Sequence, residues 1–336
     1  MTSDLQILED KPLAFSTADP SLSLVSASSR LPFETTDGTA LLNVEVFNEE
    51  VKHGPILLCI HGVCSSAETL GIQALVSDAK KSNIRVAVLE CEGHGYSSGK
   101  PGVCPDFDRL VRHACEFVSH VVSVFDQKSK EDVAFALCGN SMGGVLSIYA
   151  AEEISKAKSK SASDPDYLPF PGQFIGVAPI CPAVGVDPSA VPGCMVVQAL
   201  TYLALIAPAA TVPLTPLEDP THYNCPPDTK RNYSGHWPLG TSKMLLDVTS
   251  TRVPKDLSNN ASFLSGVASM LVITGEVDEI IPCEAVTTFY ERVVPQKKRI
   301  ITIPHAGHDL MCFMPSSKIA TSEIFAWMIS SSELIK

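Results

Sequence analysis

The stretch Gly139-Asn140-Ser141-Met142-Gly143 decides how the rest of this chain is interpreted. An apolar run at 133–137 precedes it, and a helix-like run at 145–154 follows it. The pattern G-x-S-x-G between a strand and a helix is typical of a turn so tight that glycine is needed on both sides of the serine. Such a turn would expose Ser141 above the end of the strand. The sequence therefore predicts Ser141 as a nucleophile, with Gly139 and Gly143 permitting the turn.

The composition is that of an ordinary globular chain of 336 residues, of which 45% are hydrophobic and 18% charged. Lys and Arg total 25 against 37 Asp and Glu, so the net charge is −12. A charge of this sign repels polyanions, and we expect no nucleic-acid partner. The eleven cysteines are scattered without a C-x-x-C pair, and the N-terminus has no basic and apolar leader. We therefore expect a cytoplasmic protein with reduced thiols and with no metal or organic cofactor.

Short apolar runs alternate with helical patterns along most of the chain. Strands are predicted at 56–60, 85–90, 133–137, 174–180, 270–274 and 299–303, and helices at 67–81, 107–125, 143–156, 283–294 and 316–329. This alternation predicts an α/β fold with a mostly parallel sheet and helices on both faces. A further strand at 41–47 alternates in polarity and is expected to be an antiparallel edge.

One region interrupts the alternation. Proline is dense between 182 and 257 and no clear strand is predicted there, which indicates a helical cap inserted into the core. The domain prediction is an N-terminal extension at 1–30, a core formed by 31–181 and 258–336, and a cap at 182–257. The longest apolar stretch, 194–213, lies in the cap. Polar residues and prolines interrupt it, so we expect a lid or core helix rather than a membrane span.

Two later segments supply partners for the serine. Asp278 follows the predicted strand 270–274, and His308 follows the strand 299–303. A serine hydroxyl attacks when a histidine takes its proton, and a carboxylate must hold that histidine in the right tautomer. The chain order serine, acid, histidine, with each residue at or beyond the end of a strand, therefore predicts Ser141, Asp278 and His308 as catalytic.

Neighbouring residues leave alternatives open. Glu276 or Glu279 could replace Asp278 as the acid. His305 competes with His308, but it lies almost on the strand, and we expect it to be packed rather than catalytic.

A tetrahedral intermediate needs two backbone N–H donors, which together form the oxyanion hole. We expect one donor from Met142, directly after the nucleophile, and the other from Val63 in the loop after the strand 56–60. His61 is expected to shape this loop. The thiol of Cys64 either lies beside the acyl pocket or is a small buried hydrophobe.

Five motifs follow one another along the chain: H-G-V at 61–63, E-G-H-G-Y-S-S-G at 92–99, G-N-S-M-G-G at 139–144, G-E-V-D at 275–278 and A-G-H at 306–308. Together they resemble the monoacylglycerol lipase and lysophospholipase branch of the α/β-hydrolases, which includes plant caffeoylshikimate esterase-like enzymes. The segment H-W-P-L at 236–239 is similar to the D-P-L segment that closes the cap in this group. Asn140 stands where the group usually has histidine or glutamate, and Trp237 stands in place of the aspartate. These departures concern the substrate rather than the hydrolytic chemistry.

The resemblance implies the α/β-hydrolase fold and a serine esterase acting on monoacylglycerol or lysophospholipid, whereas the residues themselves imply only acyl transfer to water. The apolar cap favours an apolar acyl chain and a transient contact with a membrane surface. A short-chain or aromatic-acyl carboxylesterase, a thioesterase or a peptidase acting on N-terminal proline would use the same triad. A non-catalytic ligand-binding protein is a further alternative, which the intact triad order argues against.

Overall fold

The structure is a computed structural model that describes residues 11–12, 28–51, 54–129, 133–159, 170–187, 189, 191, 193–218 and 233–333. The predicted N-terminal extension, 1–30, lies mostly outside the described residues. So do residues 188, 190, 192 and 219–232 of the predicted cap.

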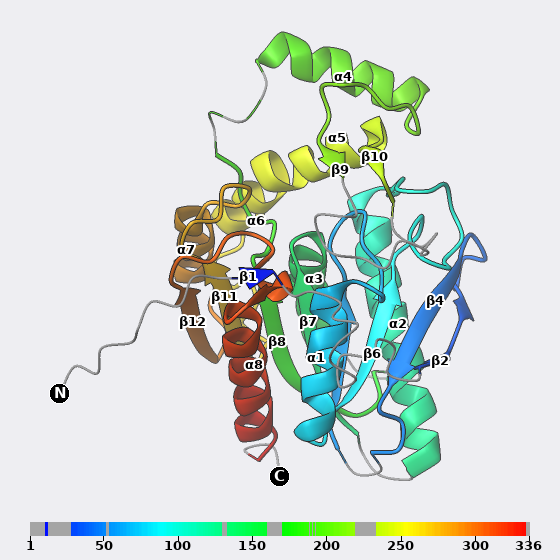
Figure 1. The fold of residues 1–336 in the computed structure, drawn as a ribbon, viewed down its shortest axis with the longest axis vertical. Helices are drawn as coiled ribbons and strands as arrows, with labels where there is room; N and C mark the ends of the chain where they lie inside the picture. Colours follow the sequence, from blue (N-terminus) through cyan, green and yellow to red (C-terminus); the bar gives the residue numbers. More distant parts are fainter. Residues whose placement is uncertain are drawn as a thin grey trace, which may run out of the picture.

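Nine strands of the described chain form one sheet, which organises the core (Figure 1). Its order is β12-β11-β8-β7-β5-β6-β4-β2, with β3 paired to β4. The strands from β12 to β6 run parallel, and β4 is antiparallel to β6. The strands span β2 (Ser28–Arg30), β3 (Phe33–Glu34), β4 (Leu41–Phe47), β5 (Ile56–Ile60), β6 (Arg85–Glu90), β7 (Ala134–Asn140), β8 (Gln173–Ile180), β11 (Ser269–Gly275) and β12 (Lys297–Ile303).

The central strands are apolar without interruption because both faces of the sheet are covered. In β5, Ile56, Leu58 and Ile60 pack into one hydrophobic layer, whereas Leu57 and Cys59 pack into the other. The period of two along a strand produces this division. A parallel sheet between two apolar layers is therefore the core of the molecule.

Helices cover both faces of this sheet. One layer contains α2 (Phe107–Ser129), α3 (Met142–Ser159) and α7 (Cys283–Arg292), and the other contains α1 (Leu70–Lys81) and α8 (Ser316–Glu333). A short 3₁₀ turn, Leu310–Cys312, leads to β13 (Phe313–Met314), which pairs with β1 (Lys11–Pro12). The predicted α/β fold class is confirmed, and the predicted core strands and helices agree with the observed ones to within a few residues.

The expectation that 41–47 forms the edge of the sheet was wrong. The strand β4 is antiparallel as predicted, but β2 and β3 both pair with it on the side away from β6. All three residues of β2 are exposed, so this strand carries no apolar pattern from which it could be predicted.

The segment predicted to be a cap lies between β8 and β11 in the sequence and above the ends of the sheet strands in Figure 1. It contains α4 (Cys194–Ile206), β9 (Leu217–Glu218), β10 (Gly235–His236), α5 (Leu239–Asp247), a π-helical turn (Val248–Arg252) and α6 (Val253–Asn259). The pair β9–β10 was not predicted, because two-residue strands are too short to show a period. The helix α4 contacts α5 but has no buried residue. None of the helices that the structure describes is long and apolar enough to cross a membrane.

Candidate active site

The predicted nucleophile lies in a strained turn between β7 and α3. Ser141 has a φ of 53°, a left-handed conformation that is rare for a residue with a side chain. A Cβ atom on Gly139 would lie 2.1 Å from the Gly143 carbonyl oxygen, and one on Gly143 would lie 2.0 Å from the Ile60 carbonyl oxygen. Glycine is therefore required at both positions. The turn is fixed by the Ser141 N–H, which donates to the Ile180 carbonyl oxygen of β8 at 3.0 Å.

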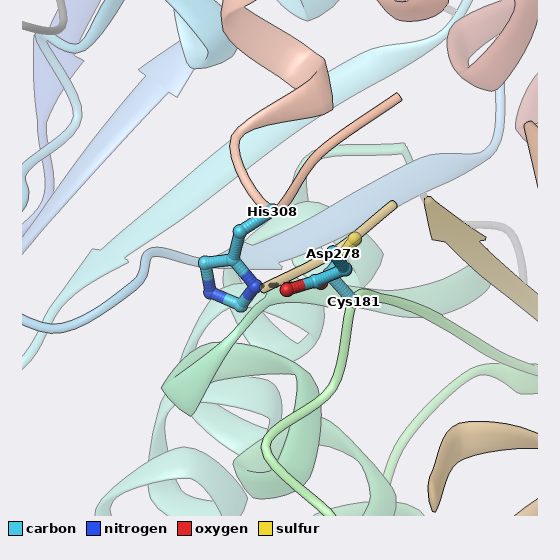
Figure 2. Close-up of side chains that lie close together, drawn as sticks. All are labelled: Cys181, Asp278 and His308. Atoms are coloured by element: carbon cyan, nitrogen blue, oxygen red, sulfur yellow. Dashed lines mark hydrogen bonds and ion pairs between the residues drawn. The ribbon is translucent and has the colours of Figure 1, made fainter. Parts of the chain in front are cut away.

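The two predicted partners lie together at the ends of neighbouring strands. Asp278 follows β11, His308 follows β12, and His308 Nδ1 lies 2.8 Å from Asp278 Oδ2 (Figure 2). The other carboxylate oxygen accepts the N–H groups of Ile280 and Ile281 at 2.9 and 2.8 Å. The Asp278 side chain is fully buried, so these bonds hold it in one orientation. An oriented carboxylate of this kind can fix the tautomer of His308.

A buried thiol completes this cluster. The Cys181 side chain follows β8 and lies against Asp278, opposite His308 in Figure 2. Burial and the neighbouring Asp278 carboxylate raise the pKa of the Cys181 thiol, which therefore remains protonated and can donate to the carboxylate. Cys181 was not predicted as a site residue, although its position directly after a central strand was a usable signal.

Cys181, Asp278 and His308 are also the residues of the described chain that could hold a metal ion, because their ligand atoms lie within 4.8 Å of one another. Asp278 and His308 already hydrogen-bond each other directly. The arrangement can thus serve proton transfer through His308 without an ion between the two side chains.

The alternative acid and base residues lie at the surface. Glu276 and Glu279 are exposed, and Glu276 accepts the His305 N–H at 2.9 Å. The expectation that His305 is packed was wrong, because its side chain is 59% exposed. The reason is local: His305 has a φ of 59°, which turns the chain out of the strand direction.

The two expected N–H donors lie just beyond the ends of the neighbouring strands β7 and β5. Met142 is the first residue of α3, so its N–H has no partner within the helix. Val63 lies in the loop after β5, the neighbour of β7, and lines the same cavity as Ser141. Cys64 is buried and also lines this cavity, so its two expected roles, pocket wall and small buried hydrophobe, both hold.

A cavity of about 110 Å³ joins these groups. Ser141 and His308 both line it, together with the loop after β5, the first half of α1 and the cap residues Tyr233 and Trp237. The structure records no hydrogen bond between Ser141 and His308, both of which it describes. Catalytic hydrogen bonds are often long before substrate binds, so this spacing does not separate the two residues functionally.

The helix α4 does not line this cavity, although the apolar cap that contains it was expected to accommodate an acyl chain. Its apolar side chains instead face away from the core: Leu205 is 76% exposed and Ile206 82% exposed. The expectation failed because apolar composition alone does not determine what a helix faces. The aromatic cap residues at the cavity, Tyr233 and Trp237, were not predicted as lining residues.

Solved structures of other proteins share this architecture. The crystal structure of a soluble variant of monoglyceride lipase from Saccharomyces cerevisiae has a TM-score of 0.67 at 15% identity, covering 91% of this chain and 95% of that chain. The monoacylglycerol lipase of Paleococcus ferrophilus has a TM-score of 0.58 at 17% identity, covering 91% and 99%. Est1E of Butyrivibrio proteoclasticus with ferulic acid bound has a TM-score of 0.55 at 17% identity, covering 90% and 99%. These similarities show the fold, and the expected resemblance to monoacylglycerol lipases and esterases is confirmed at that level.

No curated protein matches the chain in sequence. The family described as serine aminopeptidase, S33, matches residues 52–312, which include the strands that carry Ser141, Asp278 and His308. Because this match spans well over half of the chain, the chain belongs to the serine aminopeptidase S33 family and is a serine hydrolase with the α/β-hydrolase fold.

Proposed function

We propose that the chain hydrolyses carboxylic esters through an acyl-enzyme on Ser141. His308 takes the serine proton as the oxygen attacks the ester carbonyl carbon, and later returns a proton to the leaving alcohol. Asp278 orients His308, and the N–H groups of Val63 and Met142 stabilise the oxyanion. Water then attacks the acyl-enzyme with His308 again as the base. The observation that carries this proposal is the buried Asp278–His308 hydrogen bond at 2.8 Å beside the cavity that Ser141 lines.

The proposed substrate has an apolar acyl chain, as in monoacylglycerol or lysophospholipid. Most of the cavity wall is apolar, and Tyr233 and Trp237 of the predicted cap also line it. The structures similar to this chain include two lipases that act on monoacylglycerols by name, which supports the same class of substrate here.

The second candidate is a short-chain or aromatic-acyl carboxylesterase. A cavity of about 150 Å³ is enough to hold a benzene ring, so a cavity of about 110 Å³ favours a small acyl group over a long one. A long chain would have to extend beyond this cavity toward the cap. Est1E, which binds ferulic acid in its crystal structure, supports the same alternative.

Labelling with a fluorophosphonate probe tests the chemistry. The probe should label the wild type and leave Ser141→Ala unlabelled, since only an activated serine attacks phosphorus. Ser141→Ala should also lose ester hydrolysis by about a million-fold in kcat, the usual loss of a triad nucleophile. Labelling of both proteins would assign the reactive nucleophile to another residue, and labelling of neither would favour a binding protein; either result would contradict the proposed mechanism.

A series of monoacylglycerols with acetyl, butyryl, octanoyl and longer chains, kept below their micelle thresholds, separates the two substrate classes. Each buried methylene contributes about 0.8 kcal/mol, or close to fourfold in kcat/KM. A steady rise to the longer chains supports the lipase proposal. A maximum at acetyl or butyryl supports the short-chain esterase.

We also propose that α4 touches lipid surfaces transiently. No charged residue stands between Asp187 and Glu218, and the helix between them exposes Met195, Leu205 and Ile206. The net charge of −12 favours a zwitterionic over an anionic surface. Sedimentation with phosphatidylcholine vesicles should carry the wild type down, whereas Leu205→Asp with Ile206→Asp should remain in solution. Equal sedimentation of the two proteins would contradict the proposal.

We also propose a cytoplasmic location for this enzyme. None of the ten cysteines that the structure describes forms a disulfide, a pattern typical of a reducing compartment.

A further inference from the structure

Two buried histidines lie beside the loop that carries Val63. His61 directly follows β5, and His94 lies in the loop after β6, the parallel neighbour of β5. They are 1% and 3% exposed, and their ring centroids are 5.1 Å apart. Because parallel strands end at the same edge of a sheet, the two loops meet at these rings.

The hydrogen bonds of His61 define its protonation. Its Nδ1 lies 2.6 Å from the Gly62 carbonyl oxygen, which can only accept, so Nδ1 carries the proton. Its Nε2 accepts the Cys91 N–H at 3.0 Å, from the loop that follows β6. His61 is therefore a neutral Nδ1–H imidazole that uses both of its nitrogens.

His94 has the mirror-image arrangement. Its Nδ1 donates to the Glu92 carbonyl oxygen at 3.0 Å, within its own loop. Its Nε2 accepts the Cys64 N–H at 3.0 Å, from the loop after β5. Each histidine thus donates to its own loop and accepts an N–H from the other loop.

These bonds hold both peptide groups that flank Val63. The Gly62 carbonyl and the Val63 N–H belong to one peptide plane, and the Val63 carbonyl and the Cys64 N–H belong to the next. His61 holds the first plane and His94 holds the second. A hydrogen bond to the carbonyl end of a peptide also polarises its N–H end. Rotation of the first plane would turn the Val63 N–H away from the developing oxyanion, and the bond to the second plane fixes the chain directly after Val63.

The loop needs these external bonds because its own conformation is strained. Cys64 has a φ of 56°, in the left-handed region that disfavours a side chain. Burial lowers the pKa of His61 to about 4 and that of His94 to about 3, so both rings remain neutral acceptors at physiological pH.

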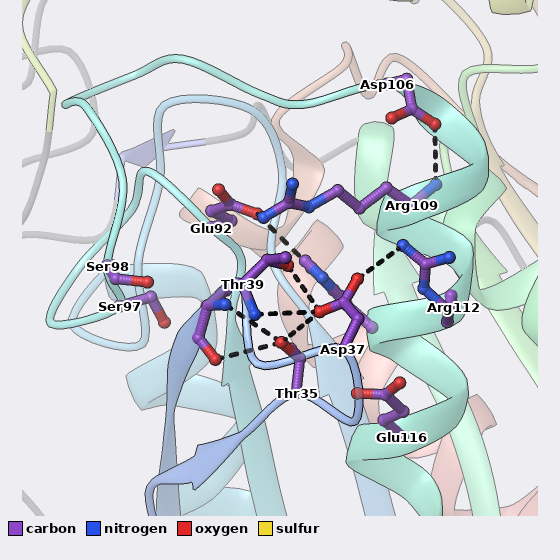
Figure 3. Close-up of polar contacts among 12 residues, drawn as sticks. Thr35, Asp37, Thr39, Glu92, Ser97, Ser98, Asp106, Arg109, Arg112 and Glu116 are labelled. Atoms are coloured by element: carbon purple, nitrogen blue, oxygen red, sulfur yellow. Dashed lines mark hydrogen bonds and ion pairs between the residues drawn. The ribbon is translucent and has the colours of Figure 1, made fainter.

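The loop that carries His94 is itself fixed to its surroundings (Figure 3). The Glu92 carboxylate pairs with Arg109 of α2 at 2.8 Å. The hydroxyls of Ser97 and Ser98 accept backbone N–H groups of the β4 strand, from Asn43 at 2.8 Å and from Leu41 at 2.9 Å. His94 is therefore attached to two elements of the core, α2 and β4.

We propose that His61 and His94 are positioning residues for the oxyanion donor Val63, acting as a reciprocal pair that fixes the peptide planes on either side of it. This inference rests on the proposed esterase function. It assigns to the H-G-V and E-G-H-G motifs one joint task, which is to aim a single N–H group.

Matched amide substitutions test the pair. Asparagine places a donor near the former Nδ1, whereas glutamine places an acceptor near the former Nε2. His61→Asn should therefore retain the bond to Gly62 and His61→Gln should lose it, while His94→Gln should retain the bond to Cys64 and His94→Asn should lose it. Since removal of one oxyanion donor costs about a hundredfold to a thousandfold in kcat, we expect the less suited amide to be about tenfold to a hundredfold slower at each position. KM should change little, and affinity for a trifluoromethyl ketone inhibitor should fall in the same order as kcat.

A preference for asparagine at position 61 and for glutamine at position 94 would distinguish a positioning role of these side chains from a packing role. His120→Gln, on α2 outside the site, is the control and should retain the wild-type kcat. The same amide preferred at both positions, or losses confined to KM, would overturn the proposal, with thermal unfolding of each variant confirming that it is folded. If the wild type hydrolyses no ester, the proposed function fails, and ¹⁵N shifts of the two rings still decide the geometry. Both should be neutral Nδ1–H tautomers from about pH 5 to about pH 8, and an Nε2–H or charged ring would overturn the pair.

Discussion

Buried neutral histidines should make this fold sensitive to mild acid. Burial lowers the pKa of His61 from 6.5 to about 4 and that of His94 from 6.5 to about 3. In the unfolded chain both would take up a proton near pH 6.5, whereas in the folded chain they resist it. The stability that depends on their neutral forms is therefore fully present above pH 6.5 and is lost as the pH falls from there toward the folded values.

The magnitude follows from the size of the shifts. Each pKa unit corresponds to about 1.4 kcal/mol, so each histidine should cost about 2 kcal/mol of unfolding free energy at pH 5 relative to pH 7. The two histidines together should cost about 4 kcal/mol, which is a large part of the unfolding free energy of a typical protein, roughly 5–15 kcal/mol. His113, also buried with its pKa lowered to about 4, acts in the same direction.

Urea denaturation at pH 7 and at pH 5, followed by circular dichroism, measures this loss. His94→Gln removes one of the titrating groups, so its loss between the two pH values should be smaller than that of the wild type by about 2 kcal/mol. His305→Gln changes an exposed ring and should leave the wild-type loss unchanged. An unfolding free energy that is equal at both pH values, or equal losses in wild type and His94→Gln, would refute the reasoning.

Three further changes test the site. Asp278→Asn should keep the fold but lower kcat by about ten-thousand-fold through the wrong histidine tautomer; steady-state kinetics would contradict this if Glu276→Gln lost more. Gly143→Ala should fold poorly, because its Cβ would lie 2.0 Å from the Ile60 carbonyl oxygen, and a melting temperature equal to that of the wild type would show that the turn can relax. Cys64 lines the cavity, so a small thiol reagent such as methyl methanethiosulfonate should inhibit the wild type and spare Cys64→Ala; equal inhibition would assign the effect to another cysteine.

The sequence was sufficient to predict the core and the placement of the candidate triad, because each depends on a local pattern. Continuous apolar runs are typical of buried parallel strands, and functional residues lie directly after such runs. The acid at Asp278 was recognisable for this reason, whereas Cys181, after an equally clear strand, belonged to no known motif.

Features that depend on tertiary contacts were not predictable in the same way. The His305 side chain points outward because His305 itself has a left-handed backbone conformation, which neither composition nor hydrophobic periodicity predicts. The exposure of α4 was not predictable either, because an apolar helix has the same sequence pattern whether it covers a pocket or faces solvent.

The sheet order has a consequence for when activity arises during folding. The nucleophile follows β7 in the centre of the sheet, whereas the acid follows β11 and the base follows β12. These are the last two core strands along the chain, and they pair with each other at the β12 edge of the sheet. A partly folded chain can therefore hold the serine in place while its proton acceptor is still absent. Parallel pairing over long sequence separations is slow, so recovery of hydrolysis after dilution from denaturant should lag behind recovery of the helical signal, and the last strand to join the sheet should set the rate at which enzyme activity returns.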